Sequence, residues 1–94
     1  FDMGHLQVHH QLGLTSFIAW LERFGRRIVG VHIHDVIGIK DHQAPGCGEV
    51  DFDLVARYLP SACYRTVEVD PSVSDIELVK GLKLLAGSGC INEI

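Results

Sequence analysis

The amino-acid sequence predicts an α/β fold with parallel strands, arranged as about three βα units in a single domain over residues 1–94. Two runs, residues 27–34 and 64–69, are rich in β-branched residues and too short for typical helices. Segments of helical character separate them, and strands that alternate with helices indicate βαβ units around a parallel sheet. A third strand is expected to end near Asp2, because the intervals from Asp2 to His32 and from His32 to Glu68 are similar.

Three helices are predicted from residues that commonly cap helix N-termini. Each has a side-chain oxygen that can accept a backbone N–H at the start of the helix. These caps are Thr15 or Ser16 for a helix that reaches Phe24 before Gly25, Asp51 or Asp53 for a helix that ends before Pro60, and Ser74 for a helix that reaches Ala86 before Gly87. The third includes a capping box, because Glu77 follows Ser74 by three residues.

One face of each predicted strand becomes polar towards its C-terminal end. Alternate side chains of a strand point to opposite faces, so Val29, Val31 and Ile33 are expected to pack under helices. His32 and His34 would then share the opposite face. A parallel strand buried on both sides is normally apolar throughout, and the C-terminal ends of strands carry the active sites of βα barrels. The polar ends therefore indicate a functional site.

Three residues at these strand ends form a candidate metal site. Asp2, His32 and Glu68 occupy corresponding places in three successive units. Two carboxylates and one imidazole on neighbouring rigid strands are suitable ligands for a divalent cation. Taken singly, each residue is better explained as a loop cap, a hydrogen-bonded core histidine or a partner of an arginine. Together, at matching places, they predict a site that holds Mn, Zn, Co or Mg.

Further candidates surround this predicted site. His5 is three residues after Asp2 and is expected to bind a substrate hydroxyl or a second metal, or else to be a surface histidine. His34 is expected to line the cavity and bind substrate, or else to lie just past the strand. His42 is expected to reach the cavity with Asp41 and bind substrate, or else both are solvated residues of a turn. The neighbouring pair His9 and His10 is expected to be solvated.

The segment 36–50 is predicted to be a long, ordered loop, a type that is often functional. Its Pro45-Gly46-Cys47-Gly48 sequence suits a tight turn with close backbone approach. Asp35, immediately before it, is expected to orient the imidazole of a neighbouring ligand. Cys47 has no helix start or fixed base that would activate it, so we interpret it as an ordinary thiol.

Composition restricts the partners. A formal net charge of −4, with eight scattered Lys and Arg residues, argues against nucleic-acid binding. Three cysteines without CxxC spacing predict reduced thiols and a cytoplasmic location. No apolar run approaches the ~20 residues that span a membrane, so no membrane partner is expected.

Four motifs in order resemble the xylose isomerase-like TIM barrels, a superfamily of sugar epimerases and isomerases, inosose dehydratases and endonuclease IV. They are DMGH, HIHD, the loop DHQAPGCGEVDF and TVEV. The resemblance implies that the chain is the C-terminal part of a TIM (β/α)8 barrel, strands six to eight. It implies that Asp2, His32 and Glu68 are metal ligands, and that His5 binds substrate or a second metal. His42 matches a ligand of a third zinc in the nuclease, but Lys40 stands where the nuclease has an aspartate.

This resemblance predicts a fragment of a metal-dependent sugar isomerase or epimerase, with Glu68 as the catalytic acid–base group and a sugar or polyol as substrate. The Glu that the family carries on strand five has no counterpart here, so we expect the chain to be inactive alone. Two alternatives stay open: an endonuclease IV-like fragment, which Lys40 and the acidic charge disfavour, and a truncated, non-catalytic protein. We expect the chain to self-associate or to join the N-terminal part of a barrel, because its strand edges would otherwise be exposed.

Overall fold

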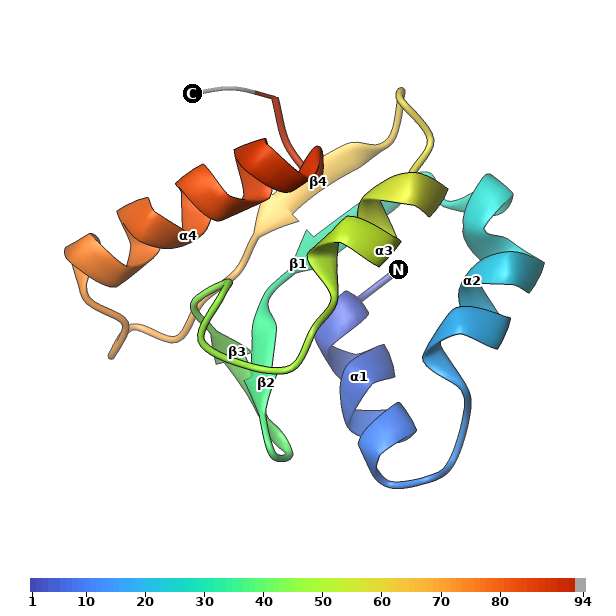
Figure 1. Cartoon of the computed structure of the whole chain (residues 1–94), viewed down its shortest axis with the longest axis horizontal. Coiled ribbons are helices and arrows are strands. Elements are labelled where there is room, and N and C mark those ends of the chain that lie inside the picture. Colours follow the sequence, from blue (N-terminus) through green and yellow to red (C-terminus); the bar gives the residue numbers. More distant parts are fainter. Residues whose placement is uncertain (93–94) are drawn as a thin grey trace.

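A computed structural model describes residues 1–92, which form short strands and α-helices around one core (Figure 1). In chain order the elements are α1 Met3–Gln11, α2 Phe17–Phe24, the 3₁₀ helix η1 Gly25–Arg27, β1 Gly30–Ile33, β2 Asp35–Ile37, β3 Lys40–Gln43, α3 Phe52–Tyr58, β4 Tyr64–Val67 and α4 Asp75–Ser88.

The strands of the described chain form two separate two-stranded sheets. Strands β1 and β4 are parallel, with Gly30 opposite Tyr64 and Ile33 opposite Val67. Strands β2 and β3 form an antiparallel hairpin with an irregular register. On the other edge of β1, Asp2 forms an isolated parallel bridge with His32. Strand β1 therefore lies between the residue Asp2 and strand β4.

The predicted barrel fragment is wrong. The described residues form a small α/β domain with a two-stranded parallel sheet and a two-stranded antiparallel sheet, not three βα units of a TIM barrel. The expected first strand contributes one bridge, because helix α1 begins at Met3 and the carboxylate of Asp2 accepts the backbone N–H of His5 at the helix start. The predicted loop 36–50 differs too, since its first part forms the hairpin β2–β3.

The predicted helix starts are confirmed. Ser16 caps α2, Asp51 caps α3, and Ser74 caps α4 with the expected capping box to Glu77. The end of α4 was predicted too early: the helix continues through Gly87 to Ser88, and Gly89 caps it with a φ of 88° in the left-handed region.

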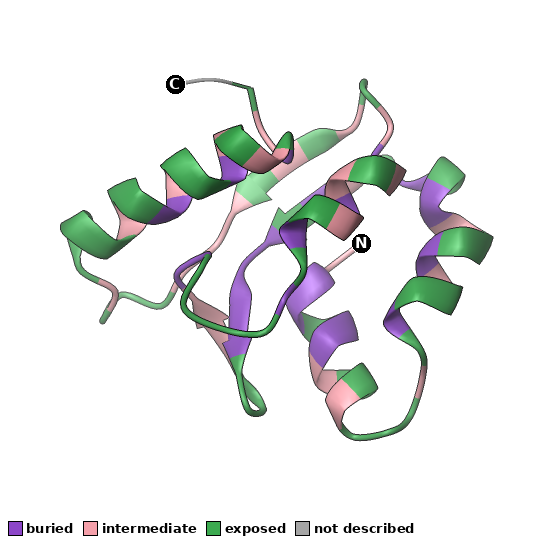
Figure 2. Ribbon diagram, in the orientation of Figure 1, coloured by how far each residue is buried: buried purple, intermediate pink, exposed green. Residues whose placement is uncertain are grey.

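The core lies on one side of the β1–β4 sheet. Val31 and Ile33 are buried there, and the core cluster includes side chains from all four helices (Figure 2). The opposite side of the sheet is open in this chain, because His32 and its register partner Thr66 are both exposed. Val29, expected to pack under helices, is 74% exposed, because the strand begins only at Gly30.

The loop after β3 is held by one buried carboxylate. Asp35 Oδ1 accepts the backbone N–H groups of Val36 and Val50, and its Oδ2 accepts those of Gly46 and Gly48, all at 2.8–3.0 Å. A Cβ atom on Gly48 would collide with the backbone of Val36, so the predicted close backbone approach is confirmed. Asp35 therefore fixes the loop, and its described hydrogen bonds include no imidazole.

Candidate metal centre

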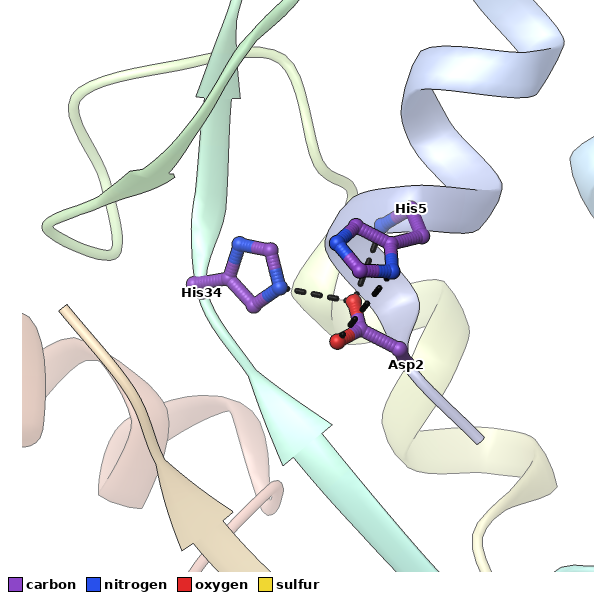
Figure 3. A group of neighbouring side chains, drawn as sticks. All are labelled: Asp2, His5 and His34. Carbon is purple, nitrogen blue, oxygen red and sulfur yellow. Dashed lines mark hydrogen bonds and ion pairs between the residues drawn. The ribbon is translucent and has the colours of Figure 1, made fainter.

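The carboxylate of Asp2 is held by one of its two oxygens. Oδ1 accepts the backbone N–H of His5 at 2.9 Å and lies 2.7 Å from Nε2 of His34 (Figure 3). Oδ2 lies 3.6 Å from Nδ1 of His5 and 3.8 Å from Nδ1 of His32. The first oxygen is therefore engaged in short hydrogen bonds, while the second faces two histidines at longer range.

Glu68 and His32 meet at the open side of the sheet. Glu68 follows β4, and its backbone N–H donates to Ile33, which keeps it beside the end of β1. Its Oε1 lies 2.6 Å from Nδ1 of His32. Although that contact is short, Oε1 is shielded from solvent and receives no hydrogen bond of acceptable geometry within the described chain. A carboxylate oxygen and an imidazole nitrogen repel at this separation unless a proton or a metal ion lies between them.

His34 lies beneath this site and is completely buried. Its Nδ1 accepts the backbone N–H of His42 at 2.8 Å, and its ring stacks on the ring of His42 with centroids 4.2 Å apart. His42 is the one non-glycine residue with positive φ in the described chain, at 56°. Such a backbone conformation is costly for a residue with a Cβ, so it persists only where surrounding contacts hold it.

A second group of polar side chains covers the site from the hairpin. The carboxylate of Asp41 lies 2.9 Å from Nδ1 of His42 and 3.3 Å from Nε2 of His5. Nε2 of His42 is 3.9 Å from Oε2 of Glu68. The hairpin therefore brings His42 between Asp41 and Glu68, on the same side as His5.

These contacts shift three pKa values. Burial by itself raises the pKa of Asp2, but the backbone N–H of His5 and the imidazole of His34 lower it by more, so the pKa lies below its ordinary value. The hydrogen bond with His42 lowers the pKa of Asp41, and the same bond raises the pKa of His42. Asp2 and Asp41 are therefore held as carboxylates at neutral pH.

Within residues 1–92, two groups of side chains place one potential ligand atom each within 4.8 Å of the others. One consists of the predicted ligands Asp2, His32 and Glu68, and the other of Asp2, His5 and His34. The predicted trio thus comes together although the barrel does not form. The donor set fits a divalent cation, because it combines two carboxylates with one imidazole and includes the unsatisfied oxygen of Glu68.

The other predicted site residues have different positions. His5 is exposed at the start of α1, and His42 lies beside Glu68, so both border the candidate centre. His34 points into the protein rather than sharing the open face with His32, because β1 ends at Ile33 and strand alternation no longer applies. His9 and His10 are exposed, as predicted. The surface hollow lined by Gly46, Phe52 and Leu84 contains none of these residues.

Two features of the site were not predicted. The first is helix α1, which brings His5 back over Asp2; the capping potential of Asp2 was the available signal. The second is the role of the backbone N–H of His42, which fixes the ring of His34. No sequence signal indicates a positive φ at a histidine in a hairpin.

Comparisons with known proteins identify one relative. The chain is 36% identical over 67 residues to the uncharacterized protein y4fM of Sinorhizobium fredii (strain NBRC 101917 / NGR234). The alignment covers 70% of this chain and 20% of that protein, so the chain spans about a fifth of the length of the relative. No family model matches the chain, and no solved structure matches it. The resemblance to xylose isomerase-like proteins therefore stays a prediction.

Between residues 1 and 92, none of the helices has both the length and the apolar character needed to cross a membrane. The three cysteines, Cys47, Cys63 and Cys90, are free thiols.

Proposed function

We propose that Asp2, His32 and Glu68 bind a divalent metal ion, and that this centre serves the isomerisation or epimerisation of a sugar or polyol. The observation that carries the metal site is Oε1 of Glu68. It is shielded from solvent, lacks a hydrogen bond within the described chain, and lies 2.6 Å from Nδ1 of His32. A cation would satisfy both atoms together with Oδ2 of Asp2. Mn, Zn, Co and Mg all accept such mixed oxygen and nitrogen ligands to different degrees.

The bound ion would polarise the carbonyl and hydroxyl oxygens of the substrate. Glu68 is the proposed acid–base group, because its second oxygen, Oε2, lies 3.9 Å from Nε2 of His42. His5 and His42 border the centre and would donate hydrogen bonds to substrate hydroxyls. The relative is about five times as long as the aligned region, so we propose that a longer protein supplies the remaining substrate contacts. The 94-residue chain alone is then inactive.

The four ordered motifs DMGH, HIHD, DHQAPGCGEVDF and TVEV support a sugar or polyol as the substrate. The three free thiols support a cytoplasmic location as part of the same proposal. The nuclease-like alternative has no comparable support, because Lys40 replaces the expected aspartate and the carboxylate of Asp41 is paired with His42.

The metal site is tested by titrating the purified chain with Zn²⁺ and Mn²⁺ in a calorimeter. We expect one ion to bind per chain, and Glu68→Gln to lower the affinity at least about tenfold, since the amide cannot supply a charged ligand oxygen. Glu22→Gln, an exposed residue on α2, is the matched control and should bind like the unsubstituted chain. Equal losses in both variants, or no stoichiometric binding of either ion, would reject the site.

The substrate class needs a measurement that does not depend on turnover. Water-proton relaxation reports the water molecules on Mn²⁺ bound to the chain. A ketose such as D-fructose that reaches the ion displaces water, so the relaxation enhancement should fall as the sugar is added. An enhancement that stays constant at saturating sugar would contradict a sugar site in this chain, while the metal site would stand.

Self-association is a second candidate property, and exposed apolar side chains favour it. Tyr64 is 78% exposed, and its backbone N–H donates to Val29, which is 74% exposed. The two lie on neighbouring segments at the start of the parallel sheet. We expect sedimentation velocity to show dimers or larger species at micromolar concentration, and Tyr64→Lys to shift the population towards monomer. A monomeric unsubstituted chain would exclude this property.

A further inference from the structure

We infer that His34 is a positioning residue, not a metal ligand. It holds Oδ1 of Asp2 in a hydrogen bond and so leaves Oδ2 of Asp2 to bind the metal ion. This inference rests on the proposed metal centre and deepens it. It decides between the two groups of potential ligands, since one of them includes Nε2 of His34.

The hydrogen-bond partners of His34 determine its tautomer. Its Nδ1 lies 2.8 Å from the backbone nitrogen of His42, which can only donate. Nδ1 must therefore present a lone pair, and in the neutral ring the proton resides on Nε2. That Nε2–H points at Oδ1 of Asp2 over 2.7 Å. A nitrogen that carries this proton has no lone pair left for a metal ion, so the group Asp2, His5 and His34 is not a metal site.

His42 and Gly4 hold the His34 ring in this position. His42 has a φ of 56°, and its N–H donates to Nδ1 of His34 at 2.8 Å. The backbone oxygen of His42 accepts the N–H of Asp70, and its ring stacks on His34. A Cβ atom on Gly4 would overlap Cε1 of the His34 ring, so only glycine leaves it enough space. The imidazole is thus confined by the His42 ring, by helix α1 and at both nitrogens.

The two carboxylate oxygens of Asp2 have different partners. Its Oδ1 receives two hydrogen bonds, from His34 and from the backbone N–H of His5 at the start of α1. Both tie the carboxylate to the protein through the same oxygen. Oδ2 remains directed towards His32, at 3.8 Å from Nδ1. A hydrogen-bonded partner that orients a ligating carboxylate typically changes metal affinity by about 10- to 100-fold when it is removed.

Long-range ¹H–¹⁵N correlation spectra of the imidazole rings test the tautomer in the metal-free chain. We expect the Nε2 shift of His34 to be that of a protonated nitrogen and its Nδ1 shift that of an unprotonated one. On addition of Zn²⁺ the Nδ1 resonance of His32 should move, and both nitrogens of His34 should keep their types. A proton on Nδ1 of His34, or loss of the Nε2 proton with zinc, would overturn the inference.

Two substitutions separate positioning from packing. His34→Gln retains an N–H donor near Oδ1 of Asp2, whereas His34→Leu retains only apolar bulk. We expect the Leu variant to bind Zn²⁺ about tenfold or more weakly and the Gln variant to stay within about threefold of the unsubstituted chain. Circular dichroism on both variants shows whether they are folded. Unchanged affinity in a folded Leu variant rejects the positioning role.

Failure of the proposed function gives a different result from failure of this inference. If the unsubstituted chain binds no Zn²⁺, the metal centre is rejected. The spectra of the metal-free chain still decide how His34 and Asp2 are arranged, because the Nε2–H tautomer does not depend on an ion. If zinc binds and His34 carries its proton on Nδ1, the metal centre stands and the positioning role is rejected.

Discussion

A side chain at Gly4 and the imidazole of His34 cannot occupy the same space: a Cβ atom on Gly4 would overlap Cε1 of the His34 ring. Helix α1 therefore packs against the start of the hairpin at a distance that only glycine permits. Glycine is usually unfavourable inside a helix, by about 1 kcal/mol relative to alanine. At position 4 glycine is needed despite this cost, because any Cβ atom would displace the His34 ring.

Gly4→Ala is expected to lower the free energy of unfolding by about 1–3 kcal/mol, because His34 or α1 must move to accept the methyl group. Gly87→Ala is the matched control. Gly87 also lies in a helix, and a Cβ atom there would meet nothing within 4 Å. That variant should be more stable by about 0.5–1 kcal/mol. Urea unfolding of both variants measures the difference, and equal changes of the same sign would contradict the predicted packing.

Asp35→Asn is expected to destabilise the chain by at least about 2 kcal/mol. The buried carboxylate accepts four backbone N–H groups, two at each oxygen. An amide replaces one oxygen with a donor, which leaves two of these N–H groups facing an NH₂ group. Asp53→Asn, at an exposed position in the first turn of α3, should change stability by less than about 0.5 kcal/mol. Chemical denaturation measures the free energy of unfolding of both variants. Similar losses in the two would argue against the role of the Asp35 carboxylate as a buried hydrogen-bond acceptor.

The local elements were predictable because their signals lie within a few residues. Ser16, Asp51 and Ser74 each accept a backbone N–H three residues later, so the sequence indicates each helix start without knowledge of the remaining chain. Helix α1 was missed because its sequence lacks the usual local signals of a helix. Gly4 and three histidines replace the usual apolar periodicity, and the capping role of Asp2 was interpreted as that of a strand end.

The arrangement of strands was less predictable, because it depends on pairing between distant residues. A regular interval between polar strand ends is compatible with three βα units, yet Asp2 forms only one bridge with β1. The candidate metal trio still assembles, since that bridge places Asp2 beside His32 and the backbone N–H of Glu68 bonds to Ile33. The burial of His34 follows from where β1 ends, which composition does not specify.

The Asp41–His42 pair predicts a dependence of stability on pH in the metal-free chain. The pKa of Asp41 is lowered by folding, so its contribution is present above the ordinary pKa of about 3.9 and is lost as pH falls through the folded value. The pKa of His42 is raised, so its contribution is complete below about 6.5 and is lost as pH rises through the folded value. Stabilisation by the pair should therefore be greatest between about pH 4 and 6.5.

Thermal unfolding of the unsubstituted chain and of Asp41→Asn at a series of pH values measures this effect. The difference in stability between the two proteins should be largest inside that interval and should shrink on both sides. The side chains of His42 and Asp41 are 34% and 38% exposed, so salt should screen their interaction and weaken the effect. A difference that stays constant from pH 3 to 8 would show that the pair does not form.

Because the two oxygens of Asp2 have different roles, we expect Asp2→Asn and Asp2→Ala to differ in their effects on stability. Asp2→Asn retains the carbonyl oxygen that accepts from His5 and His34, so the start of α1 should be preserved and stability should fall by less than about 0.5 kcal/mol, as expected between two good capping residues. Its nitrogen replaces Oδ2, so metal binding should be lost. Asp2→Ala removes both oxygens and should lose metal binding together with about 1–2 kcal/mol of stability.

Unfolding in the presence and absence of Zn²⁺ tests both effects at once. The unsubstituted chain should gain about 2.7 kcal/mol when the free ion exceeds its dissociation constant a hundredfold, whereas neither variant should respond. His32→Gln provides a comparison at an exposed ligand without a capping role: it should keep the metal-free stability and lose the response to zinc. If Asp2→Asn still gained stability with zinc, Oδ2 would not be the ligand oxygen. If it unfolded as readily as Asp2→Ala, Oδ1 would not carry the structural role.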